Sequence, residues 1–373
     1  MLSISLKKVM EVSPGFVPEH VIAGHLDMPH KRYPEKDDRL AFIDRLLPAI
    51  QSIPGVTSAA ITTNLPFSGM NSNNATAVEG FDYTDDSSIR AHYNAGVEGD
   101  YFKTMGIALK EGRLLDRMDE RSEGRVCVID EEFAAYYWQN ESPVGKRVSP
   151  EPQFTDETAV TIVGVVGSVK RNDLGDESAS GSIYYPYQQQ PWNGLALTFK
   201  TGMEPTTLYN TVRQTILDLD PELLINNLQT MDGRIEDSLT TRRAPVMLAG
   251  IFAAVALLLA GIGTYGILAY AVAQRQREVG VRMALGASPA KVRGQFLSLG
   301  LRLLAIGLVL GLIGTWFIGR MLNGLLYNMP DFHFASVFSA ACLMALVSQL
   351  ACLLPSWKAS RVPPTVALSE AGA

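Results

Sequence analysis

A run of thirty residues with no charged side chain, from Ala244 to Ala273, constrains the fold of this chain more than any other feature of its sequence. A helix needs about 20 consecutive apolar residues to cross the hydrocarbon core of a bilayer. The run is longer than that, and most of it consists of Ala, Leu, Ile, Val and Gly. We therefore predict a transmembrane helix at about residues 246–273.

Two further apolar runs follow in the C-terminal part of the chain. Residues 296–319 contain one charged side chain, Arg302, which lies near the start of the run and can extend its guanidinium toward the lipid headgroups. Residues 335–354 contain no charged side chain and end before Pro355. We predict transmembrane helices at about 296–319 and 335–355, which makes residues 244–373 an α-helical membrane domain of three transmembrane helices.

The charges divide the chain at the start of the first apolar run. Residues 1–243 carry 23 Lys/Arg and 35 Asp/Glu, a net charge of −12, whereas residues 244–373 carry 9 and 3, a net charge of +6. This division indicates a soluble domain over residues 1–243 joined to the membrane domain. Nucleic acid is excluded as a partner, because the acidic domain would repel phosphate.

The loop at residues 274–295 sets the orientation in the membrane. It holds five basic residues, whereas the loop at residues 320–334 holds only Arg320, and cytoplasmic loops carry the excess of Lys and Arg. The loop at 274–295 is therefore expected in the cytoplasm and the soluble domain outside it. The N-terminal residues 1–15 contain no hydrophobic region of a signal peptide. Either a membrane helix precedes residue 1 or the orientation is reversed, and we favour the first.

The soluble domain has the pattern of an α+β fold. A strand, a helix and a strand are predicted near the N-terminus, and the same combination recurs before the membrane domain. We expect one split βαβ-type subdomain, formed by residues 16–63 and 195–238, with a β-rich inserted subdomain at 64–190. Pro48 is expected to end or kink the first helix. The predicted strands are 19–26, 56–63, 125–129, 158–170, 182–187, 195–200 and 223–228, and the predicted helices are 37–53, 131–138 and 205–219.

Nucleotide-binding motifs are absent or misplaced. Gly261-Ile-Gly263-Thr-Tyr-Gly266 matches G-x-G-x-x-G, but no strand precedes it and it lies in a membrane-length run. Small residues there, like Gly307 and Gly311, are better explained by close packing of a neighbouring helix. The chain contains no G-x-x-x-x-G-K-[ST] motif, so any ATP must be bound by another polypeptide.

Catalytic and metal sites are also not indicated. His20, His25 and His30 are spaced by five, which matches no metal-binding pattern, so they are expected as solvated or packing side chains. The acidic run Asp130–Glu132 is best explained as a solvated helix start. Cys127 is expected as a small buried hydrophobe. We predict no catalytic residue, no metal and no cofactor bound by this chain.

Residues 277–288 (REVGVRMALGAS) resemble the E-I-G-[IV]-R-x-A-L-G-A loop of the FtsX-like, MacB-type ABC transporter permeases. The tail at 355–368 is similar to the family ending P-x-x-x-A-x-x-x-x-P-x-x-A-L. Residues 1–243 resemble the MacB-like periplasmic core domain. The chain as a whole is most similar to one repeat of the duplicated permeases described from acidobacteria. Since family members carry a membrane helix before this core, the resemblance implies a chain that lacks the first transmembrane helix. The matching core segments are Pro54-Gly55-Val56, 101–107, Gly112-Arg113 and 162–166.

The resemblance implies a non-catalytic permease subunit, located in the bacterial inner membrane with its large domain in the periplasm. Such subunits form a dimer or pseudo-dimer on cytoplasmic ABC ATPase subunits, and ATP hydrolysis drives a periplasmic conformational change for export or envelope transport. A periplasmic adaptor is a further partner, and the substrate stays open. The residues assigned to ATPase coupling are Arg277, Glu278, Val279, Gly280, Val281, Arg282, Ala284, Leu285 and Gly286.

Two alternatives stay open at this point. The loop at 274–295 could be a juxtamembrane amphipathic helix that rests on anionic lipid. The chain as a whole could be a non-transporting, membrane-anchored sensor or scaffold that regulates an envelope partner. In the coupling assignment, the charged side chains of the loop contact the ATPase, while Val279, Val281, Ala284 and Leu285 pack on the ATPase or on the membrane surface.

Overall fold

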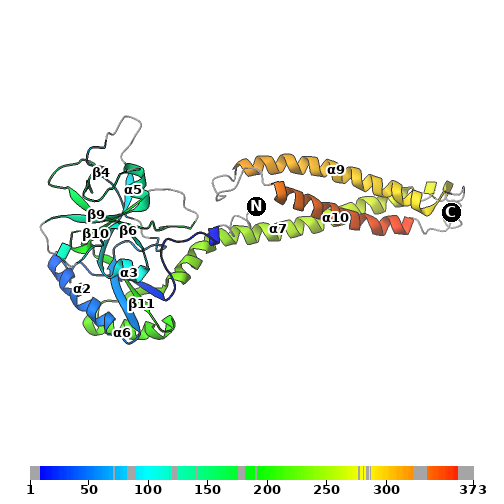
Figure 1. The fold of residues 1–373 in the computed structure, drawn as a ribbon. Helices are drawn as coiled ribbons and strands as arrows, with labels where there is room; N and C mark the ends of the chain where they lie inside the picture. Colours follow the sequence, from blue (N-terminus) through cyan, green and yellow to red (C-terminus); the bar gives the residue numbers. More distant parts are fainter. Residues whose placement is uncertain are drawn as a thin grey trace. The chain divides into compact units, whose positions relative to one another are not determined.

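The protein forms two compact units in the computed structural model (Figure 1). One unit is Glu11–Thr241, and the other combines Met1–Met10 with Arg242–Ala373. We call them the globular unit and the helical unit. The structure describes residues 9–69, 72–81, 90–116, 118–119, 124–139, 141–174, 181–189, 191–275, 278–279, 281–282, 285, 287–321 and 334–359.

The globular unit contains the predicted split βαβ arrangement. Its first half is β1 (Val21–Asp27), α2 (Lys36–Gln51) and β2 (Val56–Thr62). Its second half is β11 (Gly194–Thr201), the 3₁₀ turn η2 (Pro205–Leu208), α6 (Tyr209–Leu219) and β12 (Ile225–Thr230). The four strands lie in the order β12-β1-β11-β2, with every neighbouring pair antiparallel. The two halves therefore interleave in one sheet, as a split βαβ fold requires.

The two helices of this sheet share one core. Phe42 and Leu46 of α2, Ile216 of α6, and Ile22 and Leu197 of the strands are all fully buried in one cluster. The apolar positions of α2 recur at the helical spacing that places them on one face. Figure 1 shows α2 and α6 next to each other beside this end of the sheet.

Pro48 lies inside α2 without ending it there. The helix continues for three residues to Gln51, and the carbonyl of Pro48 accepts a hydrogen bond from the amide of Ser52 at 2.9 Å. Proline has no amide hydrogen and its ring crowds the preceding turn, so it interrupts a long helix. Here only the last turn follows it.

The inserted segment extends the same sheet instead of forming a separate one. Strand β2 pairs with β5 (Ala91–Gly99), β5 lies parallel to β10 (Ser182–Pro186), and the sheet continues through β7, β9, β8 and β4. Its remaining elements are β3 (Asn73–Ala75), β4 (Ala77–Val78), α3 (Tyr101–Met105), β6 (Leu109–Gly112), β7 (Val126–Asp130), α5 (Glu131–Tyr137), β8 (Arg147–Ser149), β9 (Val160–Val166) and η1 (Tyr187–Gln189).

The insertion nevertheless has a hydrophobic core of its own. Cys127, Ile129, Phe133, Ile162 and Tyr185 form a buried cluster that is distinct from the core under α2 and α6. The insertion therefore adds a second core to a shared sheet, although Tyr187, inside the predicted bounds 64–190, belongs to the core under α2 and α6.

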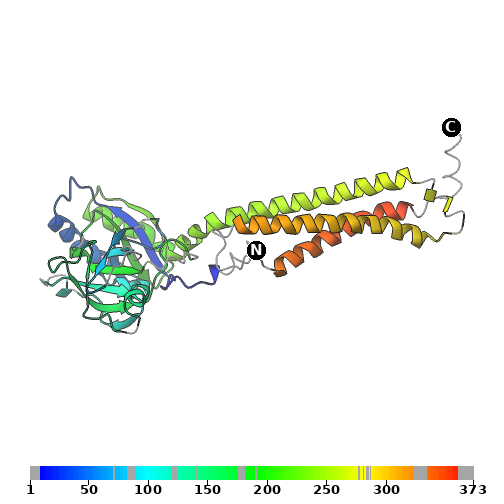
Figure 2. The same cartoon turned by 90° about the horizontal axis from the view of Figure 1, so that it is seen from above.

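The helical unit contains three long helices that run alongside one another (Figure 2). They are the C-terminal part of α7 (Met231–Gln274), α9 (Pro289–Met321) and α10 (Phe334–Ala359). Apolar side chains cover their outer faces; Phe252, Leu310 and Phe338 are each more than 60% exposed. Large apolar surfaces of this kind mark contact with lipid or with another protein.

The prediction of three membrane crossings is not confirmed. Among the described residues, one helical segment, Val246–Gln274, is both long and apolar enough to span a bilayer. The apolar stretches of the other two helices, Gly300–Gly314 and Phe338–Leu353, are shorter. The Gly261–Gly266 motif lies inside α7, whereas a dinucleotide-binding turn follows a strand and opens a helix.

Candidate functional site

The described residues between α7 and α9, in the predicted coupling segment 274–295, include helical turns. The amide of Val279 donates to the carbonyl of Arg275 at 3.0 Å, and that of Leu285 donates to the carbonyl of Val281 at 3.0 Å. α9 then begins at Pro289, since proline is favoured at the first helical position. The structure describes five of the nine predicted coupling residues. Arg277, Gly280, Ala284 and Gly286 lie outside the described residues.

A polar link ties this segment to α9. Arg282 forms an ion pair with Glu278, one helical turn before it, and its Nη1 donates to Oε1 of Gln295 at 3.2 Å. Both charged side chains are about half exposed. Exposed pairs of this spacing stabilise a helix by roughly 0.3–0.5 kcal/mol. The effect of the link is therefore mainly on the geometry of the loop.

Val279 anchors the segment inside the helical unit. Its side chain is 8% exposed and belongs to a cluster with Leu268 of α7 and Cys352 of α10, while Val272 and Leu297 pack against that cluster. We expected Val279 to pack on the ATPase or on the membrane surface. Its side chain instead faces the seam between the three helices of its own unit, because the turn after α7 points it back toward α10.

Val281 and Leu285 face the opposite way. Val281 is 42% exposed and Leu285 is 83% exposed, one helical turn further along the chain. Residues four apart share a helix face. The described part of the segment therefore presents two apolar side chains next to the charged pair Glu278–Arg282.

The four predicted packing glycines have different surroundings. A Cβ added at Gly261 would lie 3.5 Å from Cγ1 of Val347 on α10, which is an ordinary packing distance. A Cβ added at Gly263, Gly307 or Gly311 would meet no atom within 4 Å. The helix-packing role of these three glycines stays a prediction, since no close neighbour faces them here.

The close approach between helices occurs at a glycine that sequence reasoning missed. A Cβ added at Gly300 of α9 would lie 2.6 Å from Sγ of Cys352 on α10. Gly300, Gly307 and Gly311 also line a cavity of about 430 Å³ between α7, α9 and α10. The recurrence of glycine along one face of α9 was the available signal, since only glycine permits backbones to approach so closely.

Two of the family-like segments of the globular unit meet where β6 and β9 pair antiparallel. A Cβ added at Gly164 would lie 2.1 Å from the carbonyl oxygen of Arg113, and one added at Gly112, where φ is +70°, would lie 2.3 Å from that of Val163. Gly112 and Gly164 are 52 residues apart in the chain and are adjacent because they lie opposite each other in the antiparallel pair of β6 and β9. Both glycines are required by backbone packing.

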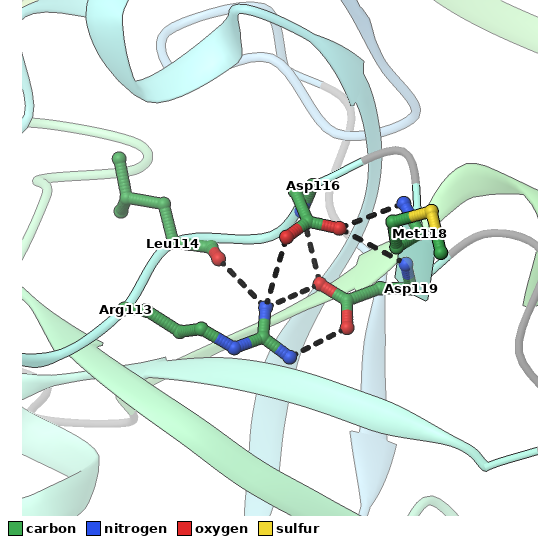
Figure 3. A network of polar contacts seen from close by, with 5 residues as sticks. All are labelled: Arg113, Leu114, Asp116, Met118 and Asp119. Carbon is green, nitrogen blue, oxygen red and sulfur yellow. Dashed lines mark hydrogen bonds and ion pairs between the residues drawn. The ribbon is translucent and has the colours of Figure 1, made fainter.

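Arg113 holds together, by hydrogen bonds, the loop that follows β6 (Figure 3). Its Nη1 and Nη2 donate to the two carboxylate oxygens of Asp119, each at 2.6 Å, and the amide of Asp116 donates to the same carboxylate at 2.9 Å. The Asp116 carboxylate accepts from the amide of Met118 at 2.7 Å. Hydrogen bonds from Arg113 lower the pKa of Asp119. The network orders a loop, and both terminal nitrogens of Arg113 donate within it.

A buried polar cluster lies where β7, β9 and β10 meet. Asp130 was predicted to be a solvated helix start, but it is 1% exposed. Its carboxylate caps α5 by accepting from the amide of Phe133 at 2.9 Å, and burial raises its pKa to about 6. Arg171 is also buried; its Nη1 donates to the carbonyl of Asn64 at 2.9 Å and it lies 5.3 Å from the ring centre of Tyr184.

Metal-binding and redox groups do not assemble in the part of the chain that the structure describes. No group of three or more His, Cys, Asp or Glu side chains there could hold a metal ion. Cys127 is buried and free, as predicted, and burial raises its pKa. The thiol is therefore not activated as a nucleophile.

Two family models cover most of the chain. The MacB-like periplasmic core domain matches residues 5–222, and the FtsX-like permease C-terminal domain matches residues 250–364. The chain belongs to the family of MacB-type, FtsX-like permeases. This confirms the resemblance seen in the loop, the tail and the core segments. The coupling segment lies in the FtsX-like part, and the Arg113 network and the Asp130 cluster lie in the MacB-like core.

The relatives of this MacB-type permease are longer than the chain itself. The macrolide export ATP-binding/permease protein MacB 2 of Aeromonas hydrophila subsp. hydrophila is 27% identical over 288 residues, which cover 74% of this chain and 43% of that protein. The macrolide export ATP-binding/permease protein MacB of Bartonella henselae is 29% identical over 291 residues, 74% of this chain and 42% of that protein. The chain thus spans less than half the length of these relatives.

A solved structure of the periplasmic region of a MacB protein is also similar to this chain. The periplasmic region of MacB from Actinobacillus actinomycetemcomitans has 18% sequence identity and a TM-score of 0.41, and the match covers 62% of this chain and 98% of that one.

Proposed function

We propose that this chain is the permease subunit of an ABC transporter that uses ATP hydrolysis by a separate cytoplasmic ATPase to drive a periplasmic conformational change, for export or envelope transport. Membership of the permease family and the export names of its relatives support this function. The chain contains no G-x-x-x-x-G-K-[ST] motif, so the ATP-binding function in the names of its relatives is assigned to the partner. The chain itself has no assigned catalytic step and no cofactor.

The structure of the coupling segment is the observation that carries the proposal. Glu278 and Arg282 form an ion pair on its exposed side, and Arg282 reaches Gln295 of α9. Val279 is buried against residues of α7, α9 and α10. A displacement of the exposed side of the segment is therefore transmitted to three helices at once. Such a link between a partner surface and rigid helices is what a switching element requires.

The membrane topology is part of the proposal. α9 has 33 residues and α10 has 26. At 1.5 Å per residue both exceed the bilayer core of about 30 Å, although their apolar stretches are shorter than that of α7. Three crossings with the basic segment 274–295 inside place the acidic globular unit in the periplasm and the protein in the inner membrane.

The proposed assembly has two permease copies or a pseudo-dimer, on a pair of ATPase subunits. The exposed apolar faces of α7, α9 and α10 supply the surface for lipid and for the second copy. A periplasmic adaptor would bind the globular unit.

The coupling assignment is tested by the double variant E278A/R282A in the full chain, reconstituted with its ATPase. We expect ATPase binding and basal hydrolysis to persist and ATP-dependent export to fall by about fivefold or more, because the loop loses both its ion pair and its link to α9. The variant E141A/K146A removes an exposed ion pair of the globular unit and is the matched control, with export unchanged.

Wild-type export in E278A/R282A would overturn the coupling assignment. If the purified chain retains an envelope hydrolase and no ATPase, the transporter proposal itself is wrong and the sensor or scaffold function replaces it.

A further inference from the structure

Arg234, in the first turn of α7, joins that helix to the edge of the sheet. Its Nη2 donates to the carbonyl of Ala23 on β1 at 3.1 Å and to the carbonyl of Asn227 on β12 at 2.5 Å. The residue is 2% exposed, and its Nε is buried without a hydrogen-bond partner. The same turn is fixed a second time, since Oγ1 of Thr230 accepts from the amide of Gly233 at 3.1 Å.

Burying this guanidinium is costly. Arginine is almost never buried so deeply without a carboxylate partner, because the desolvation of an ion costs several kcal/mol. Among the residues that the structure describes, no carboxylate forms an ion pair with Arg234. Asp237 provides the favourable charge nearby, and desolvation still lowers the pKa of Arg234. An apolar side chain would fill this space more cheaply, so the arginine points to a requirement for its hydrogen bonds.

A β-bulge in β12 contains Asn227, one of the two residues whose carbonyls Arg234 binds. Ala23 of β1 pairs with Gln229, but His25, two residues on, pairs with Asn226. Two residues of β12 therefore lie opposite the single residue Gly24. Such a bulge interrupts the ladder and leaves backbone groups unpaired at that point.

The bulge residues Asn227 and Leu228 each have a distinct role. Asn227 has φ of +51°, the left-handed conformation that asparagine tolerates, and its carbonyl accepts from Arg234. The extra residue also lets Ile225 and Leu228, three apart, both face the core. Gly24 leaves room for them, since a Cβ there would lie 2.6 Å from Cγ1 of Ile225.

We propose that Arg234 is a positioning residue that locks the first turn of α7 onto the bulged edge of the sheet, so that this turn and the periplasmic domain move as one body. Arg234 and both carbonyls lie within the globular unit, and the chain leaves that unit along α7 after Thr241. The purpose of the lock rests on the proposed transport function. Its existence depends only on the globular unit.

The lock is tested with spin labels at two exposed positions of the globular unit, Arg213 on α6 and Thr240 on α7. The full chain carries R213C and T240C, with the exposed Cys342 replaced by serine. We expect one narrow distance distribution, the same with and without ATP and the ATPase. In R234M the width should at least double, because the carbonyls of Ala23 and Asn227 are then no longer bound to the helix.

Two further variants separate the lock from general stability. R234K keeps the charge, but its nitrogen ends one bond nearer the backbone than Nη2, which makes both hydrogen bonds in the wild type. A smaller broadening is therefore expected on a protein that still folds. N227G keeps the left-handed backbone and the carbonyl, and is the matched control with the wild-type width. Wild-type widths in both R234M and R234K would overturn the lock.

Transport measurements then test whether the Arg234 lock is needed to couple ATP hydrolysis to export. In R234M, ATP-dependent export should fall about fivefold or more while ATP hydrolysis changes by less than about twofold, the pattern of a lost coupling. Full export with broadened distances would overturn the role in transport. If the wild-type protein itself shows no ATP-dependent export, the proposed function is wrong, and the label distances still decide whether the lock exists.

Discussion

At the scale of single residues, three consecutive acids of this protein have two different environments. Glu131 and Glu132 are surface residues paired with Lys110 and Lys170, whereas the carboxylate of Asp130 is buried and caps α5. The sequence pattern identified the helix start. It could not reveal that β10 and Arg171 would cover the first of the three acids, because that depends on packing between elements distant in the chain.

The buried carboxylate makes a prediction about pH. Its pKa is about 6 in the folded protein, above the ordinary aspartate value of 3.8, so between those values the folded state binds more protons than the unfolded state. Its contribution to stability therefore rises as the pH falls from 6 toward 4, by at most about 1.4 kcal/mol per pH unit. In D130N, this contribution should disappear.

Hydrogen exchange of the amides in residues 126–137, corrected for intrinsic rates, measures this effect in the full chain. D130N keeps the capping oxygen and should show a flatter pH dependence of protection than the wild type between pH 4 and 6. D130A lacks the cap and should be less stable than D130N by about 1 kcal/mol at every pH, because neither variant carries the titrating carboxylate. An unchanged pH dependence in D130N would show that another group carries it.

At the scale of elements, the sequence predicted the regular parts and missed those that depend on contacts. Both βαβ halves, the strands at 126–130 and 160–166, and helix α5 follow from apolar periodicity and turn residues. The 9-residue strand β5 was not predicted, although it links the insertion to β2. Its residues AHYNAGVEG mix polar and small side chains, and it is buried by its neighbours on the sheet.

The close antiparallel pairing of β6 and β9 leads to a prediction about stability. G164A should destabilise the globular unit by about 2 kcal/mol or more, because the new methyl would overlap the carbonyl of Arg113 and overpacking strains the backbone. G202A is the matched control, since a Cβ there meets nothing within 4 Å. The melting temperature of the full chain in detergent measures both. Equal melting temperatures for G164A and the wild type would mean that the strands can separate at no cost.

At the scale of the whole molecule, the two units are built for different surroundings. The acidic region before residue 244 has a net charge of −12, and its apolar side chains are mostly collected in two cores. The helical unit turns its apolar side chains outward. The charge boundary and the first apolar run were enough to predict this division. The direction of Val279 and the lock at Arg234 were not predictable, since each depends on a neighbour from another element, whereas the approach at Gly300 had a signal in the glycines of α9.

The proposed topology predicts which residues an impermeant thiol reagent can reach in intact cells. In a chain without Cys342, a cysteine at Ala287 should be protected, because the positive-inside rule places the basic segment in the cytoplasm. A cysteine at Asp331, in the loop with one basic residue, should react. The exposed Arg213 of the globular unit provides a positive control for the periplasmic side. Labelling at 287 with protection at 331 would reverse the orientation.

The bulge in β12 also affects how this protein avoids aggregation. β12 is at one end of the described sheet and pairs there only with β1. A flat edge strand presents a row of free amides and carbonyls onto which a strand of another molecule can add. Here the left-handed Asn227 breaks that row, and Arg234 already occupies its carbonyl. The edge beside α7 is thus a poor template for intermolecular sheet growth, even at the high local concentration of a crowded membrane surface.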